Sequence, residues 1–501
     1  MSNQNTLGSP PAKDDPSASG QSATAPSGPN RPALALTVIV TCYLMVAIDS
    51  TIVNIALPSI QKSLGFSPVS LSWVINAYLL AFGGLLLLGG RMGDMFGRRR
   101  VLVVGTVIFT ASSLLGGIAD APWMLVTARV LQGVGAAMAA PGTLALIASN
   151  FEEGAPRNRA LSIYSATAAT GTSLGLILGG ILTSLASWRW IQFVNVPIGL
   201  AVAVLAPMCI RETPSHTGRF DFVGTITGTA GITALVYGLI RVPSEGWGNT
   251  VSLGCFTAAV VLLASFLVAE RRATQPIVPL QLFSERTRAA AYTNMLMFTA
   301  TILSLFYFLS QFIQNVLEFS PIQAGLAFLP MTLGMFVVAR AVPKMLPKHG
   351  AKRFMVAGAL LMTVTAIWLS RISASDSYLT GVVGPMLLFG IGAGCCLMPT
   401  NVTVLSGVPQ QLAGAASGVL QTMMQLGGAL GLAILVTVYG TSADHAAKHA
   451  GTGADAAHQV VTEGVRSAFT GSIVFVGCAL AVALLVIRVP RPAAKPAAAK
   501  A

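Results

Sequence analysis

The chain has 501 residues, of which 54% are hydrophobic and only 9% carry a charge, and its mean hydropathy is +0.73. Soluble globular proteins carry about 25% charged residues, so this composition excludes a soluble protein and indicates an integral membrane protein with many spans. The net charge of +13 does not indicate nucleic-acid binding, because the basic residues lie between apolar runs, where they orient a membrane protein.

Residues 1–33 are expected to form a disordered tail, because they are rich in Ser, Pro, Gly and Asn and contain no apolar core. They do not have the pattern of a signal peptide. Fourteen apolar runs follow, each about long enough to cross the ~30 Å hydrocarbon core of a bilayer as a helix. The expected spans cover residues 34–57, 71–89, 101–119, 122–148, 160–185, 191–210, 222–241, 251–269, 289–316, 323–342, 354–371, 379–399, 413–439 and 471–487.

The spacing of these spans divides the chain into two bundles of six helices, at 34–210 and 288–488. Two further spans lie in a linker at 211–287, and a tail follows at 489–501. The hairpin between the second and third spans has a similar sequence in both bundles, at 97–103 and 350–356. Paired halves of this kind are typical of transporters whose substrate site lies between the bundles near the membrane midplane. The predicted fold class is an all-α integral membrane protein.

Lys and Arg residues gather in every second connection, at 91–100, 157–159, 211–219, 271–288 and 344–353. Cytoplasmic connections of membrane proteins carry such an excess. We therefore expect these connections, both termini and the C-terminal tail to lie in the cytoplasm, and the protein to reside in the inner membrane of the cell.

The connection at 90–100 contains Gly90, Asp94, Gly97, Arg98 and Arg99 in the order G-x-x-x-D-x-x-G-R-R. Any polytopic protein could use a basic loop for orientation. The spacing and the position after the second span resemble the signature loop of the major facilitator superfamily. The resemblance implies the fold of that superfamily and a cytoplasmic gate formed by these residues.

Asp49 in the first predicted span and Arg129 in the fourth are nearly the only charged residues that lie well inside the spans. A charge inside a bilayer costs at least ~2.5–3.5 kcal/mol and commonly marks function. Both residues are expected at a similar depth, so their side chains could pair across a cavity. A carboxylate near an arginine can exchange a proton for a ligand, which predicts a role in proton coupling. The alternatives are a static ion pair and an aspartate close enough to the interface to be hydrated.

Longer motifs resemble the fourteen-helix drug:proton antiporters of the same superfamily. They are D-S-T-I-V-N-I-A-L-P from Asp49, L-x-x-x-R-x-x-Q-G around Arg129, and W-R-W-I-Q-F-V-N from Trp188. The resemblance implies proton-coupled export of lipophilic or amphipathic drugs by alternating access, with cationic compounds among the candidates. Multidrug efflux and antibiotic resistance are the implied role, and the small-molecule substrate, protons and the lipid bilayer are the implied partners.

The fifth span carries Gly171, Gly175, Gly179 and Gly180, which match the glycines of the antiporters' fifth-helix motif and predict close helix packing. Leu176 stands where that motif has a proline, so a proline kink is not expected. This departure leaves open a second function, a narrow-specificity exporter or importer of a single metabolite.

Polar and aromatic residues inside the spans are candidates for lining a substrate cavity, although each could equally serve helix packing. These candidates are Gln132, Phe193, Asn294, Gln311, Gln314, Gln421 and Gln425.

No catalytic, cofactor or metal-binding pattern is present in the sequence. The six cysteines lie in apolar runs without C-x-x-C spacing. His445, His449 and His458 fall in the last outer connection, where a hydrated Ala-rich loop is expected and a weak response to metal or pH is a minor alternative. We expect neither an enzyme nor a non-transporting sensor, and the sequence leaves open whether a periplasmic adaptor is a partner.

Overall fold

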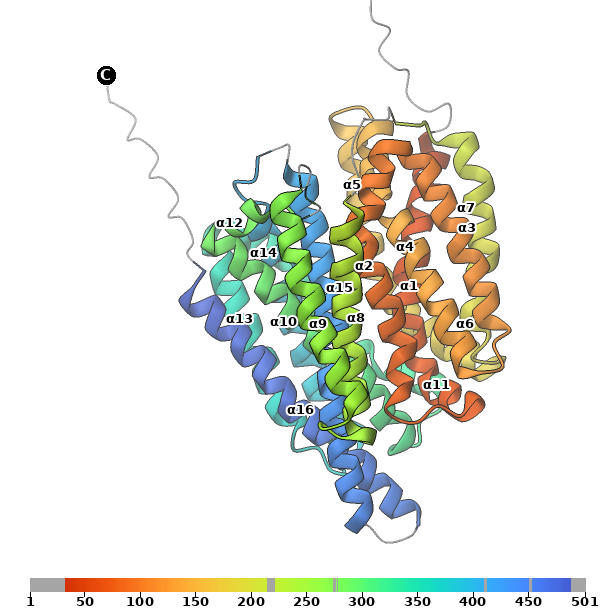
Figure 1. Cartoon of the computed structure of the whole chain (residues 1–501), viewed down its shortest axis with the longest axis vertical. Helices are drawn as coiled ribbons and strands as arrows, with labels where there is room; N and C mark the ends of the chain where they lie inside the picture. Colours follow the sequence, from red (N-terminus) through yellow and green to blue (C-terminus); the bar gives the residue numbers. More distant parts are fainter. Residues whose placement is uncertain are drawn as a thin grey trace, which may run out of the picture.

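The computed structural model describes residues 32–213, 221–273, 276, 278–409, 412–449 and 453–487. In this part of the chain all regular structure is helical, and Figure 1 shows most helices running along one common direction. Thirteen of the described segments are long and apolar enough to cross a membrane, and the apolar stretch Thr170–Leu185 belongs to a further long helix, α5 (Ala155–Leu185). The predicted class of an all-α integral membrane protein is confirmed.

The first half of the chain forms one bundle, in which α2 and α3 pack on α4, and α1 packs on α5 and α7. Its helices are α1 (Pro32–Leu64), α2 (Trp73–Phe96) after the short turn η1 (Ser70–Ser72), α3 (Arg98–Gly117), α4 (Pro122–Asn150), α5, α6 (Trp190–Phe193) and α7 (Asn195–Cys209).

The second half forms a similar bundle, in which α10 packs on α14, α15 and α16, and α14 packs on α12 and α13. Its elements are η2 (Leu280–Phe283), α10 (Arg286–Asn315), α11 (Pro321–Ala327), α12 (Leu329–His349), α13 (Ala351–Leu369), the π-helical turn η3 (Tyr378–Val383), α14 (Gly384–Leu405), α15 (Ala413–His449) and α16 (Ala454–Leu485).

Two additional helices, α8 (Phe222–Glu245) and α9 (Thr250–Arg272), pack on each other along the junction of the two halves. In Figure 1 they lie side by side, and α8 contacts both α2 and α15. Side-chain caps begin both helices: Asp221 accepts from the backbone N–H of Gly224, and Asn249 accepts from Val251 and Ser252. The caps satisfy backbone donors that the first helical turn leaves unpaired.

Two predicted spans are each divided into a short and a long helix. The segment expected at 191–210 is interrupted at Val194, and the segment expected at 323–342 is interrupted at Phe328. Pro197 and Pro330 follow these breaks closely. A proline has no N–H to donate and its ring crowds the carbonyl four residues earlier, so a continuous helix is disfavoured at both places.

The end of the molecule that carries Pro32, Arg98 and Lys352 is called the basic end, and the opposite end, with Leu64, Leu185 and Asn315, the distal end. At the basic end the predicted loop 90–100 is mostly helical, because α2 continues to Phe96 and α3 begins at Arg98. Gly97 alone makes the turn, with φ of 96°. Gly350 makes the equivalent one-residue turn between α12 and α13, with φ of 75°. Such positive φ angles favour glycine.

The prediction of a loop around the distal histidines is wrong. α15 continues to His449 and α16 begins at Ala454, so His445, His449 and His458 lie on helices that project beyond the distal end in Figure 1. The predicted ends of these two spans were placed where hydropathy falls. The helices continue beyond those points because alanine-rich segments remain good helix formers in water. The described residues contain no cluster of three or more metal-binding side chains, and His458 Nε2 lies 3.6 Å from Glu318 Oε1.

Four side-chain hydrogen bonds between described residues join the two halves near the distal end, and we call them the distal clasp. Ser310 Oγ donates to the Asn54 carbonyl (2.8 Å), Gln314 Nε2 to the Ile55 carbonyl (2.9 Å), Tyr307 OH to the Pro68 carbonyl (3.1 Å), and the Ile322 N–H to Ser184 Oγ (2.9 Å). Because α10 and α11 are tied to α1, to the connection before η1 and to α5 in this way, the halves are held together at the distal end in this conformation.

Candidate functional site

The carboxylate of Asp49 lies at the centre of a buried polar network in the first bundle. Its Oδ2 accepts a hydrogen bond of 2.6 Å from Arg129 Nη1. Its Oδ1 accepts from Asn195 Nδ2 at 2.9 Å and from Gln132 Nε2 at 3.3 Å. Asp49 has no exposed surface. A buried carboxylate is tolerated only with such partners, because the desolvation cost of an isolated charge is far larger than that of a hydrogen-bonded one.

Arg129 has partners besides Asp49, and only 1% of its side chain is exposed. Its Nε donates to the Val74 carbonyl at 2.9 Å, and its Nη1 also donates to Gln132 Oε1 at 2.9 Å. The guanidinium carbon lies 4.4 Å from the centre of the Tyr78 ring, a cation–π distance. The cation is therefore stabilised by α2 and by its own helix, so neutralising Asp49 would not leave it without partners.

Gln132 extends the network toward the distal end of the bundle. Its Nε2 lies 2.8 Å from Ser113 Oγ and 2.9 Å from Gln192 Oε1, so its two hydrogens are shared among these two acceptors and Asp49 Oδ1. Together with the bonds to Asp49 and Arg129, these contacts join α1, α3, α4 and α6 through one side chain. Of the predicted cavity residues, Gln132 is thus the one that the structure places against the charged pair.

The glycines of α5 lie where helices approach most closely. Cβ atoms added at Gly175 and Gly179 would collide with α1, at Thr51 and Ile48 for Gly175 and at the Ile52 carbonyl for Gly179. Gly171 faces Ala47 of α1 with slightly more room. These three glycines therefore pack α5 against the helix that carries Asp49.

Gly180 faces the other half of the molecule instead. A Cβ at Gly180 would lie 2.6 Å from the Pro321 carbonyl oxygen of α11, and a Cβ at Gly325 of α11 would lie 2.6 Å from the Leu176 carbonyl oxygen. The two backbones are thus in contact across the junction of the halves, next to the distal clasp. α5 is a continuous helix through Leu176, as expected for a chain without the motif proline.

The basic hairpin is held together by two acidic residues. Arg98 donates to Asp94 Oδ1 through Nη2 at 2.8 Å and through Nε at 3.1 Å. Glu212, beyond the end of α7, accepts from the backbone N–H groups of Arg99 (3.0 Å) and Arg100 (3.1 Å) at the start of α3. Its carboxylate also occupies the space where Gly97 would carry a Cβ. Gly90 lies nearer to α4, where a Cβ would be 3.7 Å from Pro141.

The remaining predicted cavity residues lie apart from the charged pair. Phe193 packs against Gly117 of α3 and Trp190. Gln311 accepts from Asn315 within α10 at 2.6 Å, whereas Gln314 belongs to the distal clasp.

The other three candidates lie in the second half. Asn294 of α10 is fully buried, and neither polar atom of its amide has a hydrogen-bond partner. Gln425 of α15 lies against Gly83 of α2, and Gln421 is one turn earlier on α15. These side chains therefore do not form one group with Asp49.

Several residues that build the site were missed by the sequence prediction. They are Asn195, Gln192 and Ser113 in the network, Tyr78 under the guanidinium, and Glu212 at the hairpin. Asn195 and Gln192 fall inside the motif that begins at Trp188, so a polar side chain within an apolar run was a usable signal. The sequence contains no comparable signal for Glu212, because its role depends on where α7 ends in space.

The network can change its charge by one proton. A carboxylate can be neutralised, whereas an arginine guanidinium stays protonated in proteins. The described residues offer no metal cluster beside it.

Comparison with known proteins gives one family. The family profile described as Major Facilitator Superfamily matches residues 39–432. The cephamycin export protein CmcT of Amycolatopsis lactamdurans is 40% identical over 412 residues, which cover 81% of this chain and 85% of that protein. The puromycin resistance protein pur8 of Streptomyces alboniger is 39% identical over 458 residues, which cover 90% of each chain.

Among solved structures, the chain resembles a bacterial homologue of the human lysosomal transporter Spinster, described as inward-facing and unoccupied. The TM-score is 0.68 at 15% identity, with 91% of this chain and 97% of that chain covered. At this identity the likeness shows the fold alone.

Proposed function

Because the chain belongs to the Major Facilitator Superfamily and is a membrane transporter rather than an enzyme, we propose that it exports lipophilic or amphipathic antibiotics in exchange for protons. Relatives with 39–40% identity over most of the chain are named for antibiotic export or resistance, which supports the substrate class. The observation that carries the proton-coupling part is the buried pair of Asp49 and Arg129, because it can take up one proton in a place where lipid disfavours charge.

Protonation of Asp49 would loosen α1 from α4. The neutral carboxyl group no longer attracts the guanidinium, while Arg129 keeps the Val74 carbonyl, Gln132 and the Tyr78 ring. The same helix α1 carries the carbonyls of Asn54 and Ile55 that the distal clasp uses. These carbonyls lie only ~7–9 Å along the helix from Asp49. A shift of α1 on protonation would therefore act directly on the clasp.

In the proposed cycle the basic end faces the cytoplasm, as its arginines and lysines favour. The described conformation, held by the distal clasp, is then the one closed to the outside. Substrate enters from the cytoplasmic side or the inner part of the membrane, the clasp opens, and an external proton binds Asp49 as substrate leaves. The distal end then closes again and Asp49 releases the proton to the cytoplasm. Alternating access of this kind rocks one bundle against the other around a site near the midplane.

The experiment that tests the function uses inverted membrane vesicles containing the protein, energised by an acidic interior. We expect uptake of puromycin, of a cephamycin or of a lipophilic cationic dye that stops when the pH gradient is collapsed by an ionophore. Vesicles without the protein are the control. If no compound of the panel is transported, or if transport is indifferent to the pH gradient, the proposal is wrong.

A second candidate is a narrow-specificity exporter or importer of a single metabolite. Two observations favour it: Leu176 stands in place of the motif proline, and the relatives named above carry the names of single antibiotics. The same vesicle panel separates the candidates, because a narrow transporter would move one compound and leave structurally unrelated dyes untouched.

A further inference from the structure

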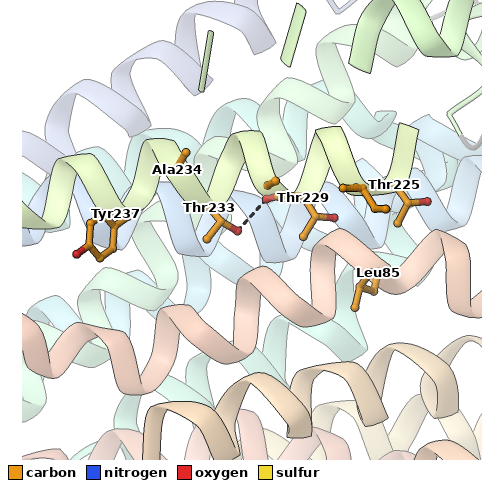
Figure 2. Close-up of a pocket in the computed structure, with 8 residues that line it drawn as sticks. Leu85, Thr225, Thr229, Thr233, Ala234 and Tyr237 are labelled. Atoms are coloured by element: carbon orange, nitrogen blue, oxygen red, sulfur yellow. Dashed lines mark hydrogen bonds between the residues drawn. The ribbon is translucent and has the colours of Figure 1, made fainter. Parts of the chain in front are cut away.

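A groove between the first bundle and the additional helices is not used by the proposed transport cycle. It has a volume of ≈ 520 Å³ and is lined by Leu85 of α2 and by residues of α8. The lining residues of α8 are Thr225, Ile226, Thr229, Ala230, Thr233, Ala234 and Tyr237. Figure 2 shows the three threonines and Tyr237 along one side of α8, with Leu85 facing them from α2.

The groove is mostly apolar, and of its three threonine hydroxyl groups only that of Thr229 is buried without a hydrogen-bond partner. Thr225 Oγ1 donates to the Asp221 carbonyl and Thr233 Oγ1 donates to the Thr229 carbonyl, each at 2.8 Å, so both hydroxyl groups turn back to their own helix. Ile226 and Tyr237 are 63% and 39% exposed. The groove is therefore apolar and open to the outside of the bundle, where the bilayer lies.

The dimensions of the groove suit one acyl chain. Thr225 and Tyr237 are twelve residues apart on α8, which corresponds to ~18 Å along a helix. One leaflet contributes about half of the ~30 Å hydrocarbon core, or ~15 Å. A chain from one leaflet would therefore occupy the groove over most of its length.

Charge distinguishes the two ends of the groove. At the distal end Arg241 lies one turn beyond Tyr237 and donates to its hydroxyl at 3.3 Å. Arg241 also lies 3.4 Å from Glu245, but its buried Nε has no hydrogen-bond partner. At the basic end the carboxylates of Asp221 and Glu270 both approach Gly224. The groove thus has a partly exposed guanidinium at its distal end, where Glu245 offsets part of the charge, and two carboxylates beside its other end, so an anionic head group is favoured at the distal one.

We propose that the α2–α8 groove binds a phospholipid with an anionic head group from the leaflet at the distal end. One acyl chain lies along Thr225, Thr229, Thr233 and Ala234, and the head group accepts hydrogen bonds from Arg241 and Tyr237. The lipid fills the space between α2 and α8 and attaches the additional pair of helices to the transport bundles. This inference does not depend on the proposed antiport.

The test is native mass spectrometry of the purified full-length protein with phosphatidylglycerol or with phosphatidylcholine of the same acyl chains. We expect the wild type to retain phosphatidylglycerol about fivefold better, the effect of one basic residue at a membrane surface. Arg241→Gln should remove this preference. Ala230→Trp and Thr233→Phe, which fill the groove, should reduce the retention of both lipids.

Two matched variants serve as controls. Arg371→Gln removes another distal arginine, and Val261→Trp fills a separate groove on α9. Both should bind lipid like the wild type. Melting curves show which variants remain folded. Equal retention of the two lipids by the wild type, or unchanged phosphatidylglycerol binding in folded Arg241→Gln or in both groove-filling variants, would overturn the proposal.

Discussion

Asp49 Oδ2 lies 2.6 Å from Arg129 Nη1, and the two side chains are 0% and 1% exposed. They come from α1 and α4 and are linked to two further helices, to α2 by the Val74 carbonyl and to α7 by Asn195. An ion pair withdrawn from water costs several kcal/mol of desolvation per ion, and apolar residues of similar volume are often as stable. The pair is therefore a weak source of stability, which is consistent with the proposed role of Asp49 in proton coupling.

The effects of substituting Asp49 and Arg129 on the free energy of unfolding should be strongly coupled. Arg129→Gln leaves Asp49 as an uncompensated buried charge, and we expect it to destabilise the protein by about 3–5 kcal/mol. The double variant Asp49→Asn/Arg129→Gln should recover part of this loss, because no charge remains buried. Unfolding by denaturant in detergent, measured for the singles and the double, gives the coupling. A double variant as unstable as the sum of the singles would show that the residues do not depend on each other.

The distal clasp should hold the conformation that is closed at that end. Gln314→Ala removes the bond to the Ile55 carbonyl. Side-chain hydrogen bonds in membranes are worth about 0.6 kcal/mol on average, so we expect the open fraction to rise about threefold. Distances between spin labels on the distal ends of α1 and α11 measure this fraction. Gln311→Ala is the matched control, since Gln311 bonds only within α10 among the described contacts, and an equal shift in both variants would contradict this role.

Gly180 should tolerate no side chain in the closed conformation. Gly180→Val would place atoms against the Pro321 carbonyl and Ile322 of α11, so the halves could not meet at the distal end. We expect transport to fall at least about tenfold while the protein remains folded, since α5 can still pack on α1. Gly171→Ala is the control, because its new methyl group faces Ala47 with more room. Normal transport by Gly180→Val would show that this contact is dispensable.

Asp94 and Glu212 should have separable effects at the basic hairpin. The Asp94–Arg98 pair is partly exposed, and exposed pairs contribute about 0–1 kcal/mol, so Asp94→Asn should melt almost like the wild type. If the hairpin is a gate, the turnover number of the Asp94→Asn variant should differ from that of the wild type, while its apparent substrate affinity stays the same. Glu212→Ala should lower the melting temperature, because the start of α3 loses two hydrogen bonds. A change in affinity alone for Asp94→Asn would argue against gating.

The sequence was sufficient for the class of fold because an apolar run of span length has few alternatives in water or lipid. It also pointed to Asp49 and Arg129, since isolated charges stand out in such runs. It was insufficient where a boundary depends on more than hydropathy. α15 and α16 continue past the predicted spans through Ala-rich segments, and breaks close to Pro197 and Pro330 divide spans that hydropathy joins.

The partners of the charged pair were harder to predict, because they come from helices far apart in the chain. Asn195 reaches Asp49 across 146 positions, and Ser310 reaches the Asn54 carbonyl across 256. Gln314 illustrates the difficulty: its sequence context favoured a cavity residue, whereas its amide bonds the backbone of the other half. Only the packing of the bundles distinguishes these two roles.

Asp49 is proposed to carry the proton, and Asp49→Asn in purified protein reconstituted into proteoliposomes tests this role most directly. The amide keeps the size of the side chain but cannot exchange a proton. Uptake driven by a pH gradient, proton movement reported by a trapped dye, and counterflow without a gradient are measured on the same vesicles, with Asp376→Asn as the control. We expect counterflow to persist while gradient-driven uptake and proton movement disappear. Proton movement and gradient-driven uptake at wild-type rates in Asp49→Asn would show that Asp49 does not carry the proton.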